Sequence, residues 1–286
     1  MKRIEVKEVL QGLLKGQSVS VCGWVRTSRD SKNMAFLEIN DGSCLKNLQI
    51  VVDKAAFGEN SDFMHLGAAL QVKGEVVPGM QEGSVEVAAR EIIVLGDAPQ
   101  DYPLQKKRHT LEFLRTMPHL RLRTRTFNAV FRMRSIISMA LHEYFQKNNY
   151  VYFHSPMITG SDCEGAGEMF QVTTHGYAPE FKSEEEYYST DFFGKKAGLS
   201  VSGQLEGEAG ALAFGKIYTF APSFRAENSN TPRHLAEFWH IEPEIAFVTL
   251  PEVLEVAEEM FRFVVGQVLD KCKDELAFFE EFYEKG

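Results

Sequence analysis

Apolar and polar residues alternate in five short stretches of the first hundred residues. Alternation with a period of two is the pattern of a half-buried β-strand. We therefore expect strands at residues 18–28, 35–40, 45–52, 69–77 and 84–95. Turn-forming residues separate neighbouring strands at Asp41-Gly42-Ser43 and at Pro78-Gly79. A helical stretch at residues 60–67 lies between the third strand and the fourth.

Three strands, a helix and two strands within about 80 residues is the order of an OB-fold, a five-stranded barrel that commonly holds oligonucleotides. Another small barrel would show the same pattern. Arg26 and Arg29 end the first strand, Phe36 begins the second, and Gln49 lies on the third. Bases stack on exposed aromatic rings, and amides read base edges. On residue type alone, however, Phe36 is more often an ordinary core aromatic.

The second half of the chain has a different pattern. Residues 127–147 carry apolar side chains at helical spacing, and Asn148-Asn149 ends this helix. Further strands are expected at residues 150–153, 199–202, 217–221, 236–240 and 242–247, with another helix at 252–271. Strands separated by irregular, glycine-containing stretches predict an antiparallel sheet with flanking helices, an α+β layout. The acidic run at residues 184–186 is expected to be a solvated loop.

Composition narrows the class of protein. The 286 residues are 44% hydrophobic and 25% charged, which excludes intrinsic disorder, a collagen and a small disulfide scaffold. No run of about 18 apolar residues occurs, and the first residues do not resemble a signal peptide. Four scattered cysteines without a C-x-x-C pair predict neither a disulfide framework nor a cysteine zinc site. We therefore expect a cytoplasmic protein that binds no membrane.

Charge is distributed unevenly along the chain. The net charge of −9 argues against unspecific coating of nucleic acid. Residues 99–135 nevertheless carry nine Lys or Arg and only two Asp or Glu. Such a cluster is either a solvated linker or a hinge that contacts phosphates. The expected organisation is a barrel at residues 1–98, a basic hinge at 99–126 and an α+β domain at 127–286.

Residues 224–244, FRAENSNTPRHLAEFWHIEPE, have the most informative chemistry. Two strand-like stretches flank a polar loop. Arg225 leaves the first stretch, Arg233 and His234 lie in the loop, and Phe238 opens the second stretch. Cations around such a loop can hold a polyphosphate, and an aromatic ring beyond it can cover a purine. From residue types alone, a surface hairpin with an incidental ion pair is an equal alternative.

This segment resembles motif 2 of the class II aminoacyl-tRNA synthetases, F-R-x-E followed by R/H and F. Residues 150–159, YVYFHSPMIT, follow the long helix and resemble motif 1, with its proline at Pro156. The OB-like domain, the basic hinge and the segments 164–168 (EGAGE) and 202–205 (SGQL) resemble the aspartyl/asparaginyl branch. Within that branch the resemblance to the asparaginyl enzymes is close and covers the whole chain.

The resemblance implies a ligase that works in two steps. The amino-acid carboxylate attacks the α-phosphate of ATP to give an aminoacyl-adenylate and pyrophosphate, and the 3′ end of the tRNA then takes the acyl group. Catalysis of this kind rests mainly on positioning and charge stabilisation. By position, Arg225 contacts the α-phosphate, Glu227 holds the adenine and the tRNA acceptor end, and Phe238 stacks on adenine. Arg233 and His234 reach the outer phosphates.

The resemblance also implies the remaining binding residues. Positions that bind the amino acid correspond to Glu164, Ser202, Gln204 and Glu242. Positions that read the anticodon on the barrel correspond to Arg26, Arg29, Phe36, Gln49 and Glu86. Motif 1 builds the dimer interface in this class, so a homodimer with Pro156 at its interface is expected.

The residues after Gln204 distinguish asparagine from aspartate. Aspartyl enzymes that resemble this chain carry Q-L-Y-K there, and the lysine pairs with the substrate carboxylate. Here Gly207 stands at the lysine position and Glu208 follows it. A buried aspartate side chain would lose its cation and meet negative charge, whereas Glu208 can accept a hydrogen bond from an amide NH₂. The expected substrates are therefore L-asparagine, ATP and tRNA(Asn), although Glu208 could also be an exposed acid at a helix start.

The chain departs from the family pattern after motif 2. Motif 3, a glycine-rich strand and helix whose arginine clamps ATP, does not occur in the sequence. Mg²⁺ is expected from the chemistry, with most of its ligands in the missing part. We therefore expect a fragment of a longer gene product, to which the activity belongs. The alternatives are an aspartyl enzyme of relaxed tRNA specificity, a catalytically silent tRNA-binding module and, ranked lower because of the barrel, an enzyme that makes free asparagine.

Overall fold

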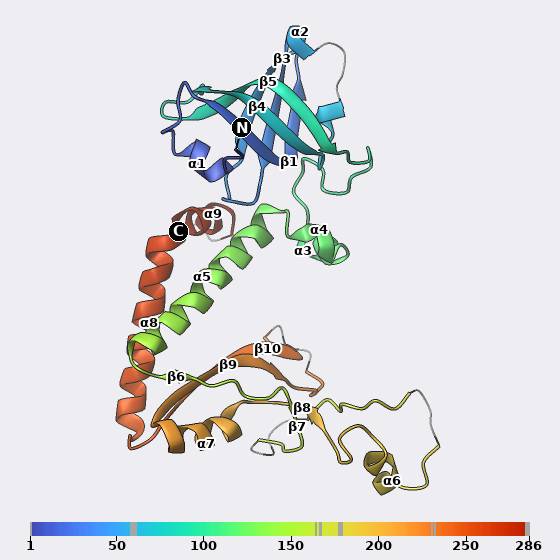
Figure 1. The fold of residues 1–286 in the computed structure, drawn as a ribbon, viewed down its shortest axis with the longest axis vertical. Coiled ribbons are helices and arrows are strands. Elements are labelled where there is room, and N and C mark those ends of the chain that lie inside the picture. The colour runs from blue at the N-terminus through green and yellow to red at the C-terminus, as the bar shows by residue number, and fades with distance from the viewer. Residues whose placement is uncertain are drawn as a thin grey trace. The chain divides into compact units, whose positions relative to one another are not determined.

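The computed structural model describes residues 2–57, 62–163, 165, 168–176, 180–229, 231 and 233–283. The chain forms two compact units. The first unit combines Met1–Arg134 with Cys272–Gly286, and the second is Ser135–Lys271. The second unit is therefore inserted into the sequence of the first. Figure 1 shows the elements in chain order, from the blue N-terminal end to the red C-terminal end.

The first unit contains a closed barrel of five strands, drawn in blue and cyan in Figure 1. The strands are β1 (Ser18–Asp30), β2 (Met34–Asn40), β3 (Leu48–Asp53), β4 (Ala69–Pro78) and β5 (Val85–Gly96), in the spatial order β1-β2-β3-β5-β4. The β3–β5 pair is parallel, and the other pairs are antiparallel. This arrangement confirms the predicted OB-fold, and all five expected strands form.

The barrel core follows from the alternation of side chains. Every second residue of β2 and β3 is buried, including Leu37, Ile39, Leu48 and Ile50, which have no exposed surface. The predicted helix at residues 60–67 is reduced to a 3₁₀ turn at Asp62–Met64, while α2 (Lys54–Phe57) forms earlier than expected. Residues 60 and 61 lie outside the described part of the chain.

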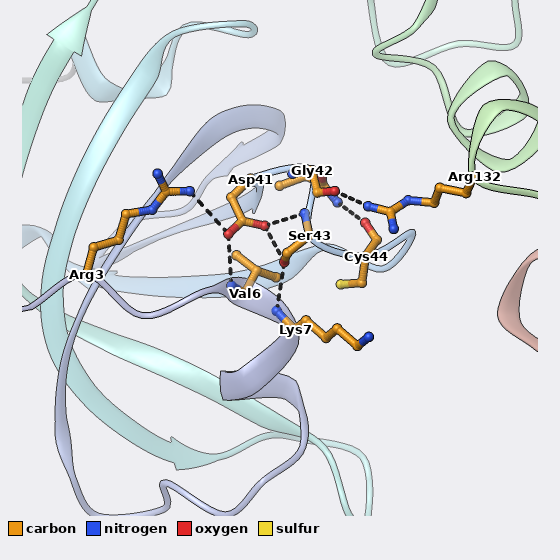
Figure 2. A network of polar contacts seen from close by, with 9 residues as sticks. Arg3, Val6, Lys7, Asp41, Gly42, Ser43, Cys44 and Arg132 are labelled. Atoms are coloured by element: carbon orange, nitrogen blue, oxygen red, sulfur yellow. Dashed lines mark hydrogen bonds and ion pairs between the residues drawn. The ribbon is translucent and has the colours of Figure 1, made fainter. Parts of the chain in front are cut away.

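The turn between β2 and β3 is joined to helix α1 (Val6–Leu10) by a polar network (Figure 2). The Asp41 carboxylate accepts the Val6 amide at 3.0 Å and the Ser43 amide at 2.9 Å, and Arg3 lies 3.6 Å away. Burial alone would raise the pKa of Asp41, but hydrogen bonds from Ser43 and Val6, with the charge of Arg3, bring the pKa below its usual value. Asp41 therefore acts as the N-terminal cap of α1 from a distant part of the sequence.

Replacing Asp41 with alanine should lower the free energy of unfolding of the first unit by about 2–3 kcal/mol, because buried donors lose a charged acceptor. The measurement is urea unfolding followed by Trp24 fluorescence in a Trp239→Phe background. Asp101→Ala, at an exposed position, serves as the control and should change stability by less than about 0.5 kcal/mol. Equal stability of the two variants would contradict the capping role.

The basic hinge contains two short helices, where the sequence predicted only a connecting segment. They are α3 (Leu111–Arg115) and α4 (Pro118–Arg121). The Thr110 hydroxyl accepts the Phe113 amide and caps α3, and a proline begins α4, where its missing N–H is no loss. Helix α9 (Lys273–Phe282), which the sequence analysis did not predict, returns to this unit. Its Phe278 packs with Leu45 of the barrel and with Ala129 of α5 (Arg125–Lys147).

The second unit has a three-stranded sheet in the order β10-β9-β6. The strands are β6 (Val151–Tyr152), β9 (Lys216–Phe224) and β10 (Glu237–Ile245). A small sheet pairs β7 (Ile158–Thr159) with β8 (Gly198–Leu199). The helices are α6 (Glu184–Ser189), α7 (Gln204–Phe214) and α8 (Leu250–Lys271). The predicted α+β layout is confirmed.

Two predictions for this unit were wrong in detail, and one helix was not predicted. The stretches 236–240 and 242–247 form one strand, because Pro243 can lie in β10, which pairs only with β9 in the described residues. The acidic run at 184–186 is the first turn of α6 rather than a loop, since Ser183 caps the helix and acidic side chains are favourable at its N-terminus. Helix α7 was not predicted.

Within the described ranges, no helix is long and apolar enough to cross a membrane.

Aromatic side chains form the core between the sheet and the helices of the second unit. Tyr218 and Phe145 are fully buried, and their rings stack with centroids 4.6 Å apart. The Tyr218 hydroxyl lies 2.8 Å from His142 Nδ1. This core fixes β9, and with it the hairpin that carries the candidate site.

Candidate active site

The β9–β10 hairpin brings Arg225 and Phe238 together. Phe238 lies opposite Ser223 in the strand register, and Arg225 leaves the end of β9. The Arg225 amide donates to the Ala236 carbonyl at 3.0 Å, so the two strands stay close where pairing ends. The Arg225 guanidinium carbon lies 5.5 Å from the centroid of the Phe238 ring, within the range of a cation–π contact.

The Arg225 side chain has unused hydrogen-bonding capacity. Its Nε is buried and has no hydrogen-bond partner in the described part of the chain. A buried guanidinium donor without an acceptor is unfavourable, and such groups in native structures often mark a position completed by a ligand. The fork geometry of arginine matches the oxygens of a phosphate or a carboxylate. The hairpin can therefore hold an anion beside an aromatic face.

Glu242 of β10 is the centre of a second cluster. Its Oε2 accepts hydrogen bonds from the Thr219 hydroxyl at 2.8 Å and from the Gly203 amide at 3.0 Å. Its Oε1 accepts a hydrogen bond from the Ser202 hydroxyl. His240 Nδ1 lies 3.1 Å from Oε1. Burial by itself raises the pKa of Glu242, but the hydrogen bonds from His240, Ser202 and Thr219 outweigh it and lower the pKa to about 2. The carboxylate is therefore ionised at neutral pH.

The Glu242 cluster fixes the start of helix α7. Glu242 accepts the amide of Gly203, the residue before the helix, and the Ser202 hydroxyl accepts the Gln204 amide at 3.1 Å. Gly203 fits because a β-carbon there would lie 2.6 Å from Ser155 Oγ and 3.1 Å from Glu242 Oε2. The structure thus brings Ser202, Gln204 and Glu242 together, as their assignment to one site requires.

Acidic side chains of α7 and β10 lie close together at the first two turns of α7. Gln204 Nε2 donates to Glu208 Oε1 at 3.0 Å. Gly207 is buried, and a β-carbon there would lie 3.2 Å from Glu244 Cγ. Burial, together with the charges of Glu208 and Glu242, raises the pKa of Glu244. Three glutamates therefore lie close enough to interact where the aspartyl pattern carries a lysine.

The remaining predicted residues have fewer contacts. Glu227, Arg233 and His234 are exposed around the hairpin loop, and the Thr231 hydroxyl bonds to His234 Nδ1. Pro156 lies in the segment between β6 and β7. Glu164 lies outside the described residues. Sequence reasoning missed Thr219, because its contact with Glu242 depends on the register of β9 against β10. It also missed His240, which lies two residues before Glu242 on β10.

Four of the five barrel residues share one outer face. Arg29 lies opposite Phe36, with its guanidinium carbon 4.8 Å from the ring centroid. Gln49 pairs with Glu86 across the β3–β5 ladder. Arg26 does not join this face, because the register of β1 shifts between Val25 and Thr27. It lies instead near Tyr102 and Arg123 of the hinge.

The described residues offer no metal site. No group of three or more His, Cys, Asp or Glu side chains in this part of the chain could hold a metal ion. The sequence analysis places most of the Mg²⁺ ligands outside this chain, so the expectation of Mg²⁺ is not tested by these residues.

Family models match both units. The model of class II tRNA synthetases (D, K and N) matches residues 110–285, more than half of the chain, and the OB-fold nucleic acid binding domain matches residues 19–95. The chain belongs to the class II tRNA synthetases of the D, K and N type. This confirms the predicted family.

The relatives described below are longer than this chain. The asparagine–tRNA ligase of Geobacter sulfurreducens is 51% identical over 288 residues, and that of Porphyromonas gingivalis is 50% identical over 290 residues. Each match covers 100% of this chain and 62% of the relative. The asparaginyl-tRNA synthetase of Pyrococcus horikoshii, solved with asparaginyl-adenylate, is 27% identical with a TM-score of 0.82, over 98% of this chain and 61% of that chain. The chain thus spans about three-fifths of the length of these relatives.

Proposed function

We propose that the complete protein is an asparagine–tRNA ligase. It activates L-asparagine with ATP to asparaginyl-adenylate and transfers the asparaginyl group to the 3′ end of tRNA(Asn). The observation that carries this proposal is about 50% identity, over the whole chain, to curated relatives named asparagine–tRNA ligase. The activity is assigned to the complete protein because the chain spans 62% of the length of those relatives.

In this proposal the β9–β10 hairpin binds ATP. Arg225 donates to two oxygens of the α-phosphate and stabilises the charge that develops there during attack by the asparagine carboxylate. Phe238 covers the adenine ring, and Arg233 and His234 reach the outer phosphates. Glu227 holds the adenine end and the acceptor end of the tRNA. The buried, unpartnered Nε of Arg225 supports this assignment, since an oxygen acceptor would satisfy it.

The amino acid binds beside the start of α7. Glu164 and Gln204 hold the ammonium and main-chain groups of asparagine, with Ser202 at the same site. Glu242 acts as a positioning residue, because its carboxylate is already occupied by Ser202, Gly203 and Thr219. Holding the first turn of α7 in place fixes the orientation of Gln204, which supports catalysis through positioning.

Glu208 selects the amide over the carboxylate. A carboxylate oxygen accepts the NH₂ group of asparagine, whereas an aspartate side chain would face Glu208, Glu242 and Glu244 without a cation. The interaction of Glu244 with the other two glutamates, which raises the pKa of Glu244, supports this reasoning. The outer barrel face with Arg29, Phe36, Gln49 and Glu86 reads the anticodon. The protein acts as a homodimer.

The test is pyrophosphate exchange into ATP by the natural full-length product, with asparagine and aspartate in parallel. We expect exchange with asparagine alone. Glu208→Gln should reduce the preference for asparagine about ten-fold or more, through loss of a charge-assisted hydrogen bond. Glu206→Gln, two residues earlier on the same helix, is the control and should keep the preference. Exchange with aspartate would favour a relaxed aspartyl enzyme, and exchange with neither amino acid would favour a tRNA-binding module.

A further inference from the structure

A pocket of about 490 Å³ lies within the first unit. Its walls come from four segments of the chain: strand β1, the connection from β2 to β3, the hinge with the start of α5, and helix α9 with the residue after it. Among the residues that the structure describes, six cationic side chains line it, namely Arg26, Lys106, Lys107, Arg108, Arg123 and Arg125, and no Asp or Glu does. The volume is within the range of small-molecule sites, about 300–1,000 Å³. The pocket therefore offers a positive site in a protein with a negative net charge.

The positive charges of the pocket are not neutralised. In the described part of the chain, none of the six side chains forms an ion pair with a carboxylate. Arg26 is half-buried, and its pKa is lowered by that burial and by the charge of Arg123, although Tyr102 acts in the opposite direction. Cations gathered without counter-charges repel one another, so an anion bound here would be stabilised by all of them.

The pocket also has an aromatic wall. Tyr102 is buried, and its hydroxyl accepts a hydrogen bond from Arg123 at 3.1 Å. Phe282 and Tyr283, at the end of α9, are partly exposed, with 43% and 46% of their surface accessible. Exposed rings beside arginines suit a planar group that carries negative charge, because stacking and charge recognition act on the same molecule.

We propose that this pocket binds a free nucleotide. Arg26 and the hinge residues Lys106 to Arg108 hold the phosphate, and Phe282 and Tyr283 cover the base. A lining drawn from four separate segments favours a single small molecule over a polynucleotide, which would need a groove that continues along its backbone. This site lies in the first unit, apart from the β9–β10 hairpin, and it does not rest on the proposed function.

Trp24 provides a direct reporter for the experiment. The chain has two tryptophans, so Trp239→Phe leaves Trp24 alone. The guanidinium of Arg123, which lines the pocket, lies 5.2 Å from the centroid of the Trp24 ring. The 286-residue chain is titrated with AMP, GMP, CMP and UMP and, separately, with inorganic pyrophosphate and a single-stranded oligoribonucleotide. Calorimetry repeats each titration. The titrated chain also carries Arg225→Ala, so that the β9–β10 hairpin contributes no nucleotide binding.

We expect saturable binding of at least one mononucleotide. Arg26→Gln should weaken it about ten-fold or more, and Tyr283→Ala, at a partly exposed position, should weaken it without affecting folding. Arg90→Gln, an exposed barrel arginine outside the pocket, is the matched control and should bind normally. No saturable binding of any mononucleotide, equal weakening by Arg90→Gln, or Arg26-dependent binding of the oligoribonucleotide alone would overturn the proposal.

Discussion

Replacing Arg225 with alanine in the natural full-length product is expected to lower asparagine-dependent pyrophosphate exchange about a thousand-fold. Removing one donor that stabilises developing charge in an active site typically costs a factor of about 10²–10³, and Arg225 offers a forked pair of donors. Its buried Nε has no acceptor among the described residues, so an oxygen of the bound phosphate would be its partner. The loss should appear in kcat as well as in kcat/KM.

Two further variants define the cause of this loss. Arg225→Lys keeps the charge but removes the fork, and it should recover only part of the activity. Arg262→Ala removes an exposed arginine that pairs with Glu258 on α8 and should exchange pyrophosphate at the normal rate. A loss of less than ten-fold in Arg225→Ala would contradict the assignment of this residue to the α-phosphate.

The second large effect concerns the stability of the second unit at low pH. The pKa of Glu242 is about 2 in the folded chain, against about 4.3 in an unfolded chain. A lowered folded-state pKa stabilises the fold above the unfolded pKa, and this stability is lost as the pH falls from about 4.3 towards 2. Since one pKa unit corresponds to 1.36 kcal/mol, the contribution at neutral pH is about 3 kcal/mol.

Glu242→Gln should therefore lower the free energy of unfolding at pH 7 by about 2–3 kcal/mol and flatten its fall between pH 4.5 and 2. Urea unfolding followed by Trp239 fluorescence in a Trp24→Phe background measures this, because Trp239 lies on β10. Glu258→Gln, on the exposed side of α8, is the matched control and should keep the pH dependence. If both variants lose stability in parallel with the unmodified chain as the pH falls, Glu242 is not the group responsible.

The barrel could be predicted because its signal is local. Alternation alone defines β1 to β5, and buried residues such as Leu37 and Ile50 follow that alternation. The position of Arg26 could not be predicted, because a shift of register within β1 changes the face that its side chain occupies. A pattern with period two carries no information about where such a bulge occurs.

Helix α7 and the Glu242 cluster required information that is not local. The buried face of α7 consists of Gly207, Gly210 and Ala211, so the sequence lacks the stripe of large apolar residues that marks most helices. Glu242 meets Thr219 because they are opposite each other in the β9–β10 ladder. The resemblance to a family placed Glu242 in a site, but the contacts that lower its pKa come from the fold.

The insertion of the second unit into the first affects how the protein is made. A barrel closed by β5 can fold once Gly96 has left the ribosome, but the packing of Phe278 on Leu45 and Ala129 cannot form until helix α9 has been synthesised. At about 5–20 residues per second, the stretch from Arg134 to Cys272 takes roughly seven to thirty seconds to translate. During that interval Leu45 and Ala129 lack their contact with Phe278 on the nascent chain.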